Sequence, residues 1–213
     1  MKAKDKNGRK RGRPQAELQQ YTRQKIIEAA SSLFEIYDFR NVTVRNIADQ
    51  AHVNSAMVSY YFKSKNGLLF HMFCEVVDEL AERLQNIIEK KETGVEGFIR
   101  EYSEVLSKNT WFAVFIAKEI YFGTGGMREQ AVKYIQAHVS PRLIALIETD
   151  MAAGRYKTGV DPRIIVITIS GLAAYPFLVR KGLSFSLNDK ETLESIIKTN
   201  TGIFLNGILA EHS

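Results

Sequence analysis

The chain has little of several residues whose scarcity restricts its class. Its one cysteine, Cys74, rules out a disulfide within the chain and fits a reducing cytoplasm. Only four prolines occur in 213 residues, and long runs of Leu, Ile, Ala, Glu and Lys favour an all-helical protein. The N-terminus is basic, but no apolar stretch follows it. We therefore expect no secretory signal and predict a cytoplasmic protein.

The sequence motifs of common enzyme classes are also missing. There is no G-x-S-x-G elbow, no Walker loop, no H-E-x-x-H and no C-x-x-C. The glycine-rich run at residues 123–126 is not preceded by a strand pattern or followed by Lys-Ser/Thr, so it predicts a helix stop rather than a phosphate site. We therefore predict no catalytic residue, no enzyme activity and no cofactor.

One pair of side chains has a spacing that could hold a metal ion. His71 and Cys74 are three residues apart and would share a helix face. No third ligand is evident, so packing is favoured and no metal site is predicted. A redox role for Cys74 is the alternative, but no Lys or Arg flanks the thiol to lower its pKa.

The excess positive charge lies at one end of the chain. The net charge is +5, yet residues 1–13 alone carry seven Lys or Arg against one Asp. Residues 14–63 hold five basic and five acidic groups, and residues 64–213 hold 17 basic and 18 acidic ones. We predict a disordered basic arm over residues 1–21 that attracts phosphate through counterion release.

Three arginines in this arm have a pattern suited to a DNA minor groove. Arg11 and Arg13 stand on either side of Gly12, Arg9 precedes them, and Pro14 follows and favours an extended backbone. Narrow minor grooves attract inserted arginines. The arm is therefore predicted to contact a groove or the DNA backbone, and a solvated tail is the alternative.

Residues 43–51 predict a short amphipathic helix. Thr43 is a good N-cap because its hydroxyl can accept from a free backbone N–H. An apolar stripe at helical spacing follows, formed by Ile47, Ala48 and Ala51. The chain is expected to break near His52, a residue type that tolerates a left-handed turn.

A second short helix is predicted directly after this break. Asn54 or Ser55 can cap it, while Val53, Met57 and Val58 can pack inward. Its free face would carry Ser55, Ala56, Ser59 and Tyr60. Two helices joined by a turn of three to four residues, the second with small polar groups on its free face, indicate a helix-turn-helix. Short side chains allow such a helix to enter a major groove.

The segment resembles the DNA-binding domain of the TetR-like (tetracycline-repressor) transcription regulators. The family pattern is T-x-R-x-I-A, then A-G-V-S, then Y-x-Y-F-x-x-K. The chain has T-V-R-N-I-A at 43–48, A-H-V-N at 51–54 and S-Y-Y-F-K-S-K at 59–65. The resemblance covers roughly Thr22 to Phe73, about a quarter of the chain. His52 replaces the usual glycine, and Ser59 replaces a tyrosine of many members, which alters one expected DNA contact.

The resemblance implies a role for each of these residues. The free face of the second helix would meet base edges, and Arg45 would reach a base or a phosphate. Thr43, Tyr61 and Lys65 would hold phosphates and set the register. The full predicted DNA-binding set is Arg9, Arg11, Arg13, Thr43, Arg45, Asn54, Ser55, Ala56, Ser59, Tyr60, Tyr61 and Lys65.

Apolar periodicity and breaks predict the remaining helices. A first helix would be capped by Thr22, and a long one would run from about Lys65 to about Lys91. Further helices are expected over residues 95–108, 110–122, 127–153 with a kink or join at Pro141, 164–179 and 189–209. We predict an all-α fold with a three-helix domain at 22–67 and an effector-binding and dimerisation domain at 68–213.

Residues 164–179 are apolar nearly all round. The run has 16 residues and includes Thr168, Ser170 and Pro176, so it falls short of the roughly 20 that cross a bilayer, and no membrane span is predicted. In a soluble protein such a helix is buried against something. In the TetR-like family the last two long helices form a four-helix bundle with a second subunit. The resemblance thus implies a homodimer with two-fold symmetry on a near-palindromic operator.

The resemblance also implies a small-molecule effector pocket in the second half. Aromatic residues are dense between Trp111 and Phe122, and ligand sites are mainly apolar with a few polar groups. Ordinary core packing is the alternative for each of them, and Arg142 or His138 could meet an anionic group. The candidates are Trp111, Phe112, Phe115, Tyr121, Phe122, Tyr134, His138, Arg142 and Tyr175.

These features predict a ligand-responsive transcription regulator, a repressor by the family's usual mode. A small molecule would release it from a palindromic operator. One alternative is a nucleoid-associated or division-linked DNA-binding protein of the same fold without a metabolite effector. Another is a helical enzyme fused to a DNA anchor, for which no catalytic constellation is evident.

Overall fold

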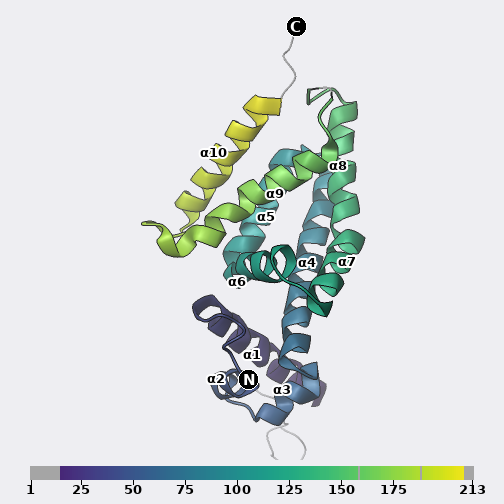
Figure 1. Cartoon of the computed structure of the whole chain (residues 1–213). Coiled ribbons are helices and arrows are strands. Elements are labelled where there is room, and N and C mark those ends of the chain that lie inside the picture. The colour runs from purple at the N-terminus through teal and green to yellow at the C-terminus, as the bar shows by residue number, and fades with distance from the viewer. Residues whose placement is uncertain (1–14, 158, 188, 209–213) are drawn as a thin grey trace, which may run out of the picture. The chain divides into compact units, whose positions relative to one another are not determined.

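The computed structural model describes residues 15–157, 159–187 and 189–208, and its regular elements there are all helices (Figure 1). The predicted all-α class is confirmed. The chain forms two compact units that divide between Leu69 and Phe70.

The first unit is built on three helices, α1 (Gln15–Ile36), α2 (Val44–Ala51) and α3 (Ser55–Phe62). The long α1 packs against both of the short helices, which also pack against each other. All three contribute apolar side chains that are almost fully buried: Ile26, Ala30, Phe34, Ile47, Ala48, Val58 and Phe62. The small core therefore fixes the short helices without using the outer face of α3.

The start predicted for the first helix is wrong. Helix α1 begins at Gln15, so Thr22 lies inside it and the segment 15–21 is helical rather than part of a disordered arm. The Thr22 hydroxyl donates to the carbonyl oxygen of Leu18 at 2.8 Å, which is the alternative that a threonine has to capping. Residues 1–14, with the predicted contacts of Arg9, Arg11 and Arg13, lie outside the described residues.

Helix α4 (Lys65–Lys90), which agrees with the predicted range, begins in the first unit and continues into the second. Its first turn approaches the end of α3 closely. A Cβ atom on Gly67 would lie 2.1 Å from the carbonyl oxygen of Phe62, far inside contact distance. Only glycine therefore fits at this position without moving one helix relative to the other.

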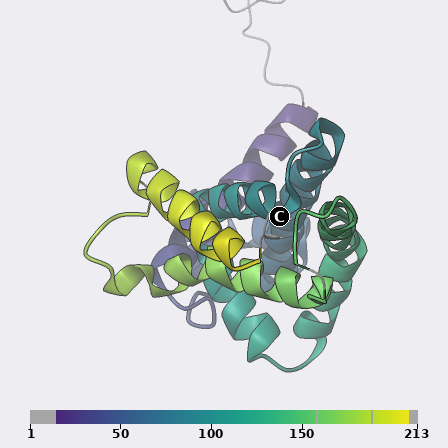
Figure 2. The same ribbon diagram turned by 90° about the horizontal axis from the view of Figure 1, so that it is seen from above.

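The second unit is arranged around α5 (Gly94–Lys108). This helix packs against α8 (Ser140–Ala152), α9 (Pro162–Val179) and α10 (Lys190–Ile208). Figures 1 and 2 both show α9 and α10 as neighbours within this unit. The predicted join at Pro141 is confirmed, because α7 (Gly126–His138) ends just before α8 begins with Pro141 in its first turn.

The helix predicted over residues 110–122 takes two forms. Helix α6 (Thr110–Phe115) continues as a π-helix, η1 (Ile116–Tyr121). A π-helix is rare, and such segments often occur at functional sites. A short turn, η2 (Arg180–Gly182), follows α9.

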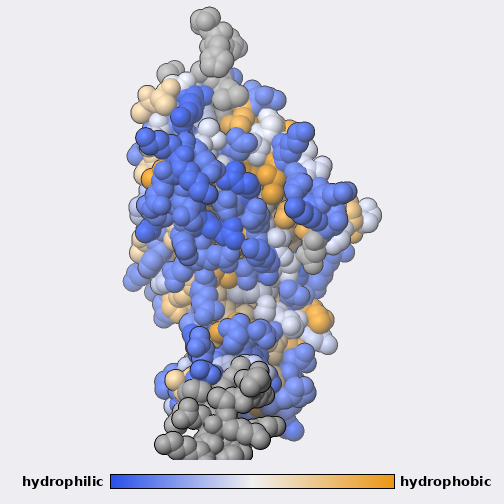
Figure 3. Space-filling view, turned by 180° about the vertical axis from the view of Figure 1, so that it is seen from behind, coloured by the Kyte–Doolittle hydropathy of each residue, from blue (hydrophilic) through white to orange (hydrophobic). Residues whose placement is uncertain are grey.

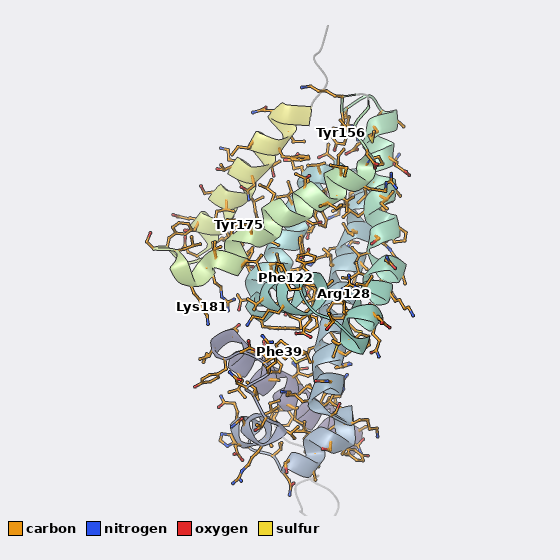
Figure 4. All side chains as sticks on the ribbon, in the orientation of Figure 1. Phe39, Phe122, Arg128, Tyr156, Tyr175 and Lys181 are labelled. Carbon is orange, nitrogen blue, oxygen red and sulfur yellow. The ribbon has the colours of Figure 1, made fainter. Side chains whose placement is uncertain are left out.

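A buried carboxylate fastens α5 to the end of α8. Asp150 is 1% exposed and accepts hydrogen bonds from the backbone N–H of Gly94 and the hydroxyl of Tyr156, both at 2.6 Å. Arg155 donates to its other oxygen and pairs with the charge. The Gly94 N–H is in the first turn of α5, where the helix dipole also favours a negative charge. Figure 4 shows Tyr156 beside the end of α8.

Pro176 lies inside α9, and its missing N–H leaves the carbonyl oxygen of Leu172 without its helical donor. The side-chain amide of Asn200 in α10 donates to this oxygen at 3.2 Å. The proline is thereby tolerated, and the bond ties α10 to α9.

Helix α9 has a half-exposed apolar surface. By length and composition alone the segment Pro162–Gly182, longer than the 16 residues considered above, could cross a membrane, a test that core helices of soluble proteins also pass; 28% of its apolar 18-residue window is buried. Its exposed apolar residues are Ile164, Ile167, Tyr175 and Leu178. The face of the molecule seen in Figure 3 is, in contrast, mostly hydrophilic with separate apolar patches.

Candidate DNA-binding interface and internal cavity

The start of α2 is fixed by a reciprocal cap. The Thr43 hydroxyl oxygen accepts from the backbone N–H of Asn46 at 3.1 Å, and the Asn46 side-chain oxygen accepts from the Thr43 N–H at 2.9 Å. The Thr43 hydroxyl also donates to that oxygen at 2.6 Å. The predicted cap is confirmed, and asparagine takes the place that glutamate or glutamine has in most such boxes. A phosphate contact of Thr43 stays a prediction.

His52 makes the turn between the two short helices. It adopts the left-handed conformation at φ 53° and ψ 46°, as predicted for the position where the family has glycine. The N–H of the following residue, Val53, donates to the Ala48 carbonyl at 3.0 Å, which closes the end of α2. Asn54 then caps α3 by accepting from the N–H of Ala56 at 2.8 Å.

The two sides of α3 differ as the sequence predicted. Val58 and Phe62 are buried against the first unit's core. Ser55, Ala56, Ser59 and Tyr60 are all exposed, and the Tyr60 side chain remains 63% exposed while its ring meets Tyr61 edge-on at 5.0 Å. A short capped helix therefore presents small polar groups and one aromatic ring outward, which suits entry into a major groove.

Two predicted phosphate ligands differ in how free their charged groups are. Arg45 is exposed on α2 and, among the described residues, pairs loosely with Asp49 at 3.9 Å. The Lys65 ammonium instead donates to the carbonyl oxygens of Phe39 and Val42 at 2.8 Å each, and of Arg40 at 3.4 Å. An ammonium has three donors, so Lys65 holds the loop between α1 and α2. Its phosphate contact stays a prediction that would require one of these bonds to open.

A cavity of about 440 Å³ lies within the second unit. This volume is in the range of small-molecule sites. The wall is mostly apolar and comes from α4 to α9, including the π-helix: Val77, Leu80, Phe98, Tyr102, Phe112, Ile116, Ile120, Tyr121, Val132, Ile135, Gln136, Val139, Ser140, Leu143, Val166, Ile167 and Ser170. The polar members are uncharged side chains, and Ile167 on α9 is also 68% exposed.

The structure brings only Phe112 and Tyr121 of the nine predicted pocket residues to this wall. Trp111 and Phe115 lie in a buried cluster in which their rings are 6.0 Å apart. Phe122 is 84% exposed, and Tyr175 is exposed on α9; Figure 4 labels both.

The other three predicted pocket residues already have partners away from the wall. The Tyr134 hydroxyl donates to the Asp78 carboxylate, and its ring stacks on His138 at 4.0 Å. Arg142 donates to the His138 carbonyl at 2.5 Å. Neither Arg142 nor His138 is part of the wall, so the predicted contact with an anionic ligand is not supported by their positions.

Sequence reasoning missed Tyr102, whose side chain lines the cavity from α5. The signal was available in its spacing, because Tyr102 follows Phe98 by one helical turn on the buried side of an amphipathic helix. Tyrosine on such a side is usually assigned to the core.

Cys74 is partly buried, and burial raises the pKa of its thiol to about 11. A hydrogen bond with Tyr134 opposes this shift, and the charges of Asp78 and Glu75 add to it. The thiol is therefore protonated at neutral pH, a state that reacts slowly with oxidants. His71, the other half of the pair considered as metal ligands, bonds Glu75 at 2.8 Å.

Comparison with known proteins gives a consistent result. Residues 26–72 match the family model of bacterial regulatory proteins, tetR family. Over 64 residues the chain is 44% identical to the probable HTH-type transcriptional regulator YttP of Bacillus subtilis (strain 168), which is 30% of this chain and 31% of that protein. It is 24% identical over 142 residues to the fatty acid metabolism regulator protein of the same strain, covering 65% of this chain and 73% of that one.

A solved structure extends the likeness to the second unit. The ketosteroid transcriptional regulator KstR2 of Mycobacterium tuberculosis superposes with a TM-score of 0.73 at 17% identity, over 89% of this chain and 95% of that one. At this identity the likeness concerns the fold. The matched residues 26–72 contain the capped α2–turn–α3 segment described above. Residues 26–72 are therefore similar to the matched part of bacterial regulatory proteins of the tetR family, and the fold as a whole resembles that of a solved transcriptional regulator.

Proposed function

We propose that this protein is a transcription regulator that binds operator DNA through α3 and releases it when a small molecule binds. The observation that carries the proposal is the outward face of α3, formed by Ser55, Ala56, Ser59 and Tyr60 on a helix capped at a tight turn. Regulators of this family bind DNA operators and small-molecule effectors and act as dimers. A role in the cytoplasm, where bacterial DNA is found, follows from the proposal.

The direct test is to map the genomic sites that the protein occupies and to measure binding to duplexes made from them. Tyr60→Ala should weaken binding to these duplexes by about 1–3 kcal/mol and spare random DNA, because base contacts carry specificity. Tyr37→Ala is the matched control, since Tyr37 is also an exposed tyrosine of the first unit but lies directly after α1, away from α3 in the sequence. Equal losses on both kinds of DNA would refute the base-reading role of α3.

We further propose a homodimer through α9 and α10. These helices expose Ile164, Ile167, Tyr175 and Ile203, and an apolar surface of this kind is normally covered in solution. A second copy would cover it and would present two α3 helices to successive major-groove turns. In sedimentation, the wild type should be a dimer, and Ile203→Glu should shift it toward monomer. A monomeric wild type that still binds its sites would contradict this arrangement.

The cavity in the second unit is our proposed effector site. A ligand can weaken DNA binding only by its differential affinity for the two conformations, so it must bind the DNA-incompetent one more tightly. A nucleoid-associated or division-linked protein of the same fold would need no such cavity. Many dispersed genomic sites and no compound that releases DNA would favour that alternative.

A further inference from the structure

The cavity wall carries a hydroxyl, that of Tyr102, which has no hydrogen-bond partner within the described part of the chain. Tyr102 is 7% exposed and stacks on Phe98 with ring centroids 5.3 Å apart, which fixes its ring against the wall. Its hydroxyl makes no hydrogen bond with any described residue. The residue as a whole is buried, but its hydroxyl oxygen keeps some accessible surface and can face the space of the cavity. This group is therefore free to bond a ligand.

The surroundings of Tyr102 make it a donor rather than an anion. Burial, and to a smaller extent the nearby Tyr121, raises the pKa of its hydroxyl above the ordinary value of 10.0. The group stays protonated over the physiological range and can donate to an oxygen or nitrogen that accepts.

The rest of the wall, as formed by the residues that the structure describes, offers no charge that could balance a charged ligand. Its other polar side chains are Tyr121, Gln136, Ser140 and Ser170, all uncharged. Transferring an ionised group into such a site costs several kcal/mol unless it meets a counter-charge. A neutral ligand avoids this cost and gains from the apolar area that surrounds it.

We propose that the cavity binds an uncharged, largely apolar molecule that accepts a hydrogen bond from Tyr102 through a carbonyl or similar oxygen. The inference rests on the proposed function, in which this cavity is the effector site. It assigns Tyr102 as a specificity residue. The cavity volume corresponds to about fifteen waters of liquid, so a compound of comparable size would fill it.

A displacement experiment on the free protein tests this class of ligand. The neutral dye N-phenyl-1-naphthylamine is bound first, and its fluorescence reports displacement at pH 8. Two isosteric competitors, undecan-2-one and the decanoate ion, differ in that a methyl group of the ketone is a charged oxygen in the carboxylate. We expect the ketone to displace the dye at a concentration at least about tenfold lower.

Variants locate the binding and test the hydrogen bond. Tyr102→Phe should weaken the ketone about threefold to tenfold, because one hydrogen bond is removed. Tyr134→Phe is the matched control, since its hydroxyl bonds Asp78 outside the cavity, and it should change nothing. Val132→Phe places a larger side chain at the cavity wall and takes up part of the cavity, so it should weaken the binding of both the dye and the ketone. Melting curves of each variant show that it is folded.

The outcomes separate this inference from the proposed function. Equal or tighter binding of decanoate, no saturable binding of the dye, or an unaffected Tyr102→Phe variant would each overturn the neutral class or the role of Tyr102. None of these results changes the binding of mapped sites by the ligand-free protein. Failure to bind those sites would instead overturn the proposed function. The ranking of ketone over carboxylate is measured on the protein without DNA and does not depend on that result.

Discussion

Replacing Asp150 is the sharpest test of how the second unit is held together. Its carboxylate accepts from the Gly94 N–H and the Tyr156 hydroxyl and pairs with Arg155, while only 1% of the residue is exposed. Alanine would leave the N–H and the hydroxyl buried without an acceptor. Removing one partner of a buried charged network costs about 3–5 kcal/mol.

The expected effect on melting follows from the size of the chain. At roughly 2–4 °C per kcal/mol for a protein of this length, Asp150→Ala should lower the melting temperature by roughly 6–20 °C. Asp150→Asn keeps one carbonyl oxygen and should cost less. Glu148→Ala, on the exposed side of the same helix, is the control and should have little effect.

Ligand binding provides a second measurement on the same variant. Asp150 holds the start of α5 against the end of α8, and both helices contribute to the cavity wall. Asp150→Ala should therefore also weaken the dye at temperatures where the protein is still folded. Calorimetry and dye titration measure the two effects. A melting temperature equal to that of Glu148→Ala would refute the reasoning that this carboxylate is a structural fastener.

Three further predictions concern other parts of the chain. Gly67→Ala should destabilise the protein by about 1–3 kcal/mol and weaken binding to every duplex, because its Cβ would meet the Phe62 carbonyl. Gly126→Ala is the control, since no atom lies within 4 Å of a Cβ there. Equal melting temperatures of the two variants would contradict the predicted clash. Deleting residues 2–13 should reduce the slope of log affinity for DNA against log salt concentration by about one for each phosphate that the arm neutralises. An unchanged slope would show that the arm does not contact phosphates. Burial and the bond to Asp150 raise the pKa of Tyr156, so its hydroxyl contributes fully to stability below about pH 10, the pKa in the unfolded chain, and less as pH rises. In denaturant unfolding, the stability difference between wild type and Tyr156→Phe should therefore narrow above that pH. A constant difference would show that ionisation of Tyr156 is not linked to stability.

The α2–turn–α3 segment could be predicted because its determinants are local. The Thr43 cap, the left-handed His52 and the Asn54 cap each involve groups a few residues apart, and the family pattern has the same spacing. Local signals are also where the error arose at Thr22. A threonine hydroxyl can cap a helix or donate to a carbonyl one turn earlier, and sequence spacing does not distinguish the two.

The cavity could not be predicted because its wall is assembled from helices far apart in the chain. Aromatic density near Trp111 indicated a pocket, but that residue and Phe115 fill the core, while Phe122 is exposed. Tyr102 lines the cavity instead, and what distinguishes it is a hydroxyl without a partner among the described residues. An unpaired group of this kind depends on which side chains do not reach a point in space, and no pattern of spacing encodes it.

Helix α9 connects the two proposals for the second unit. Val166, Ile167 and Ser170 contribute to the cavity wall, yet Ile167 is largely exposed on the helix that we propose for the dimer interface. A ligand and a partner subunit would thus contact one helix from two sides. Where the ligand changes the affinity between the subunits, dimerisation must change the affinity for the ligand by the same factor, because linkage between two binding events is reciprocal. A change in the affinity between the subunits is therefore a way in which a ligand in the cavity can alter the affinity for DNA.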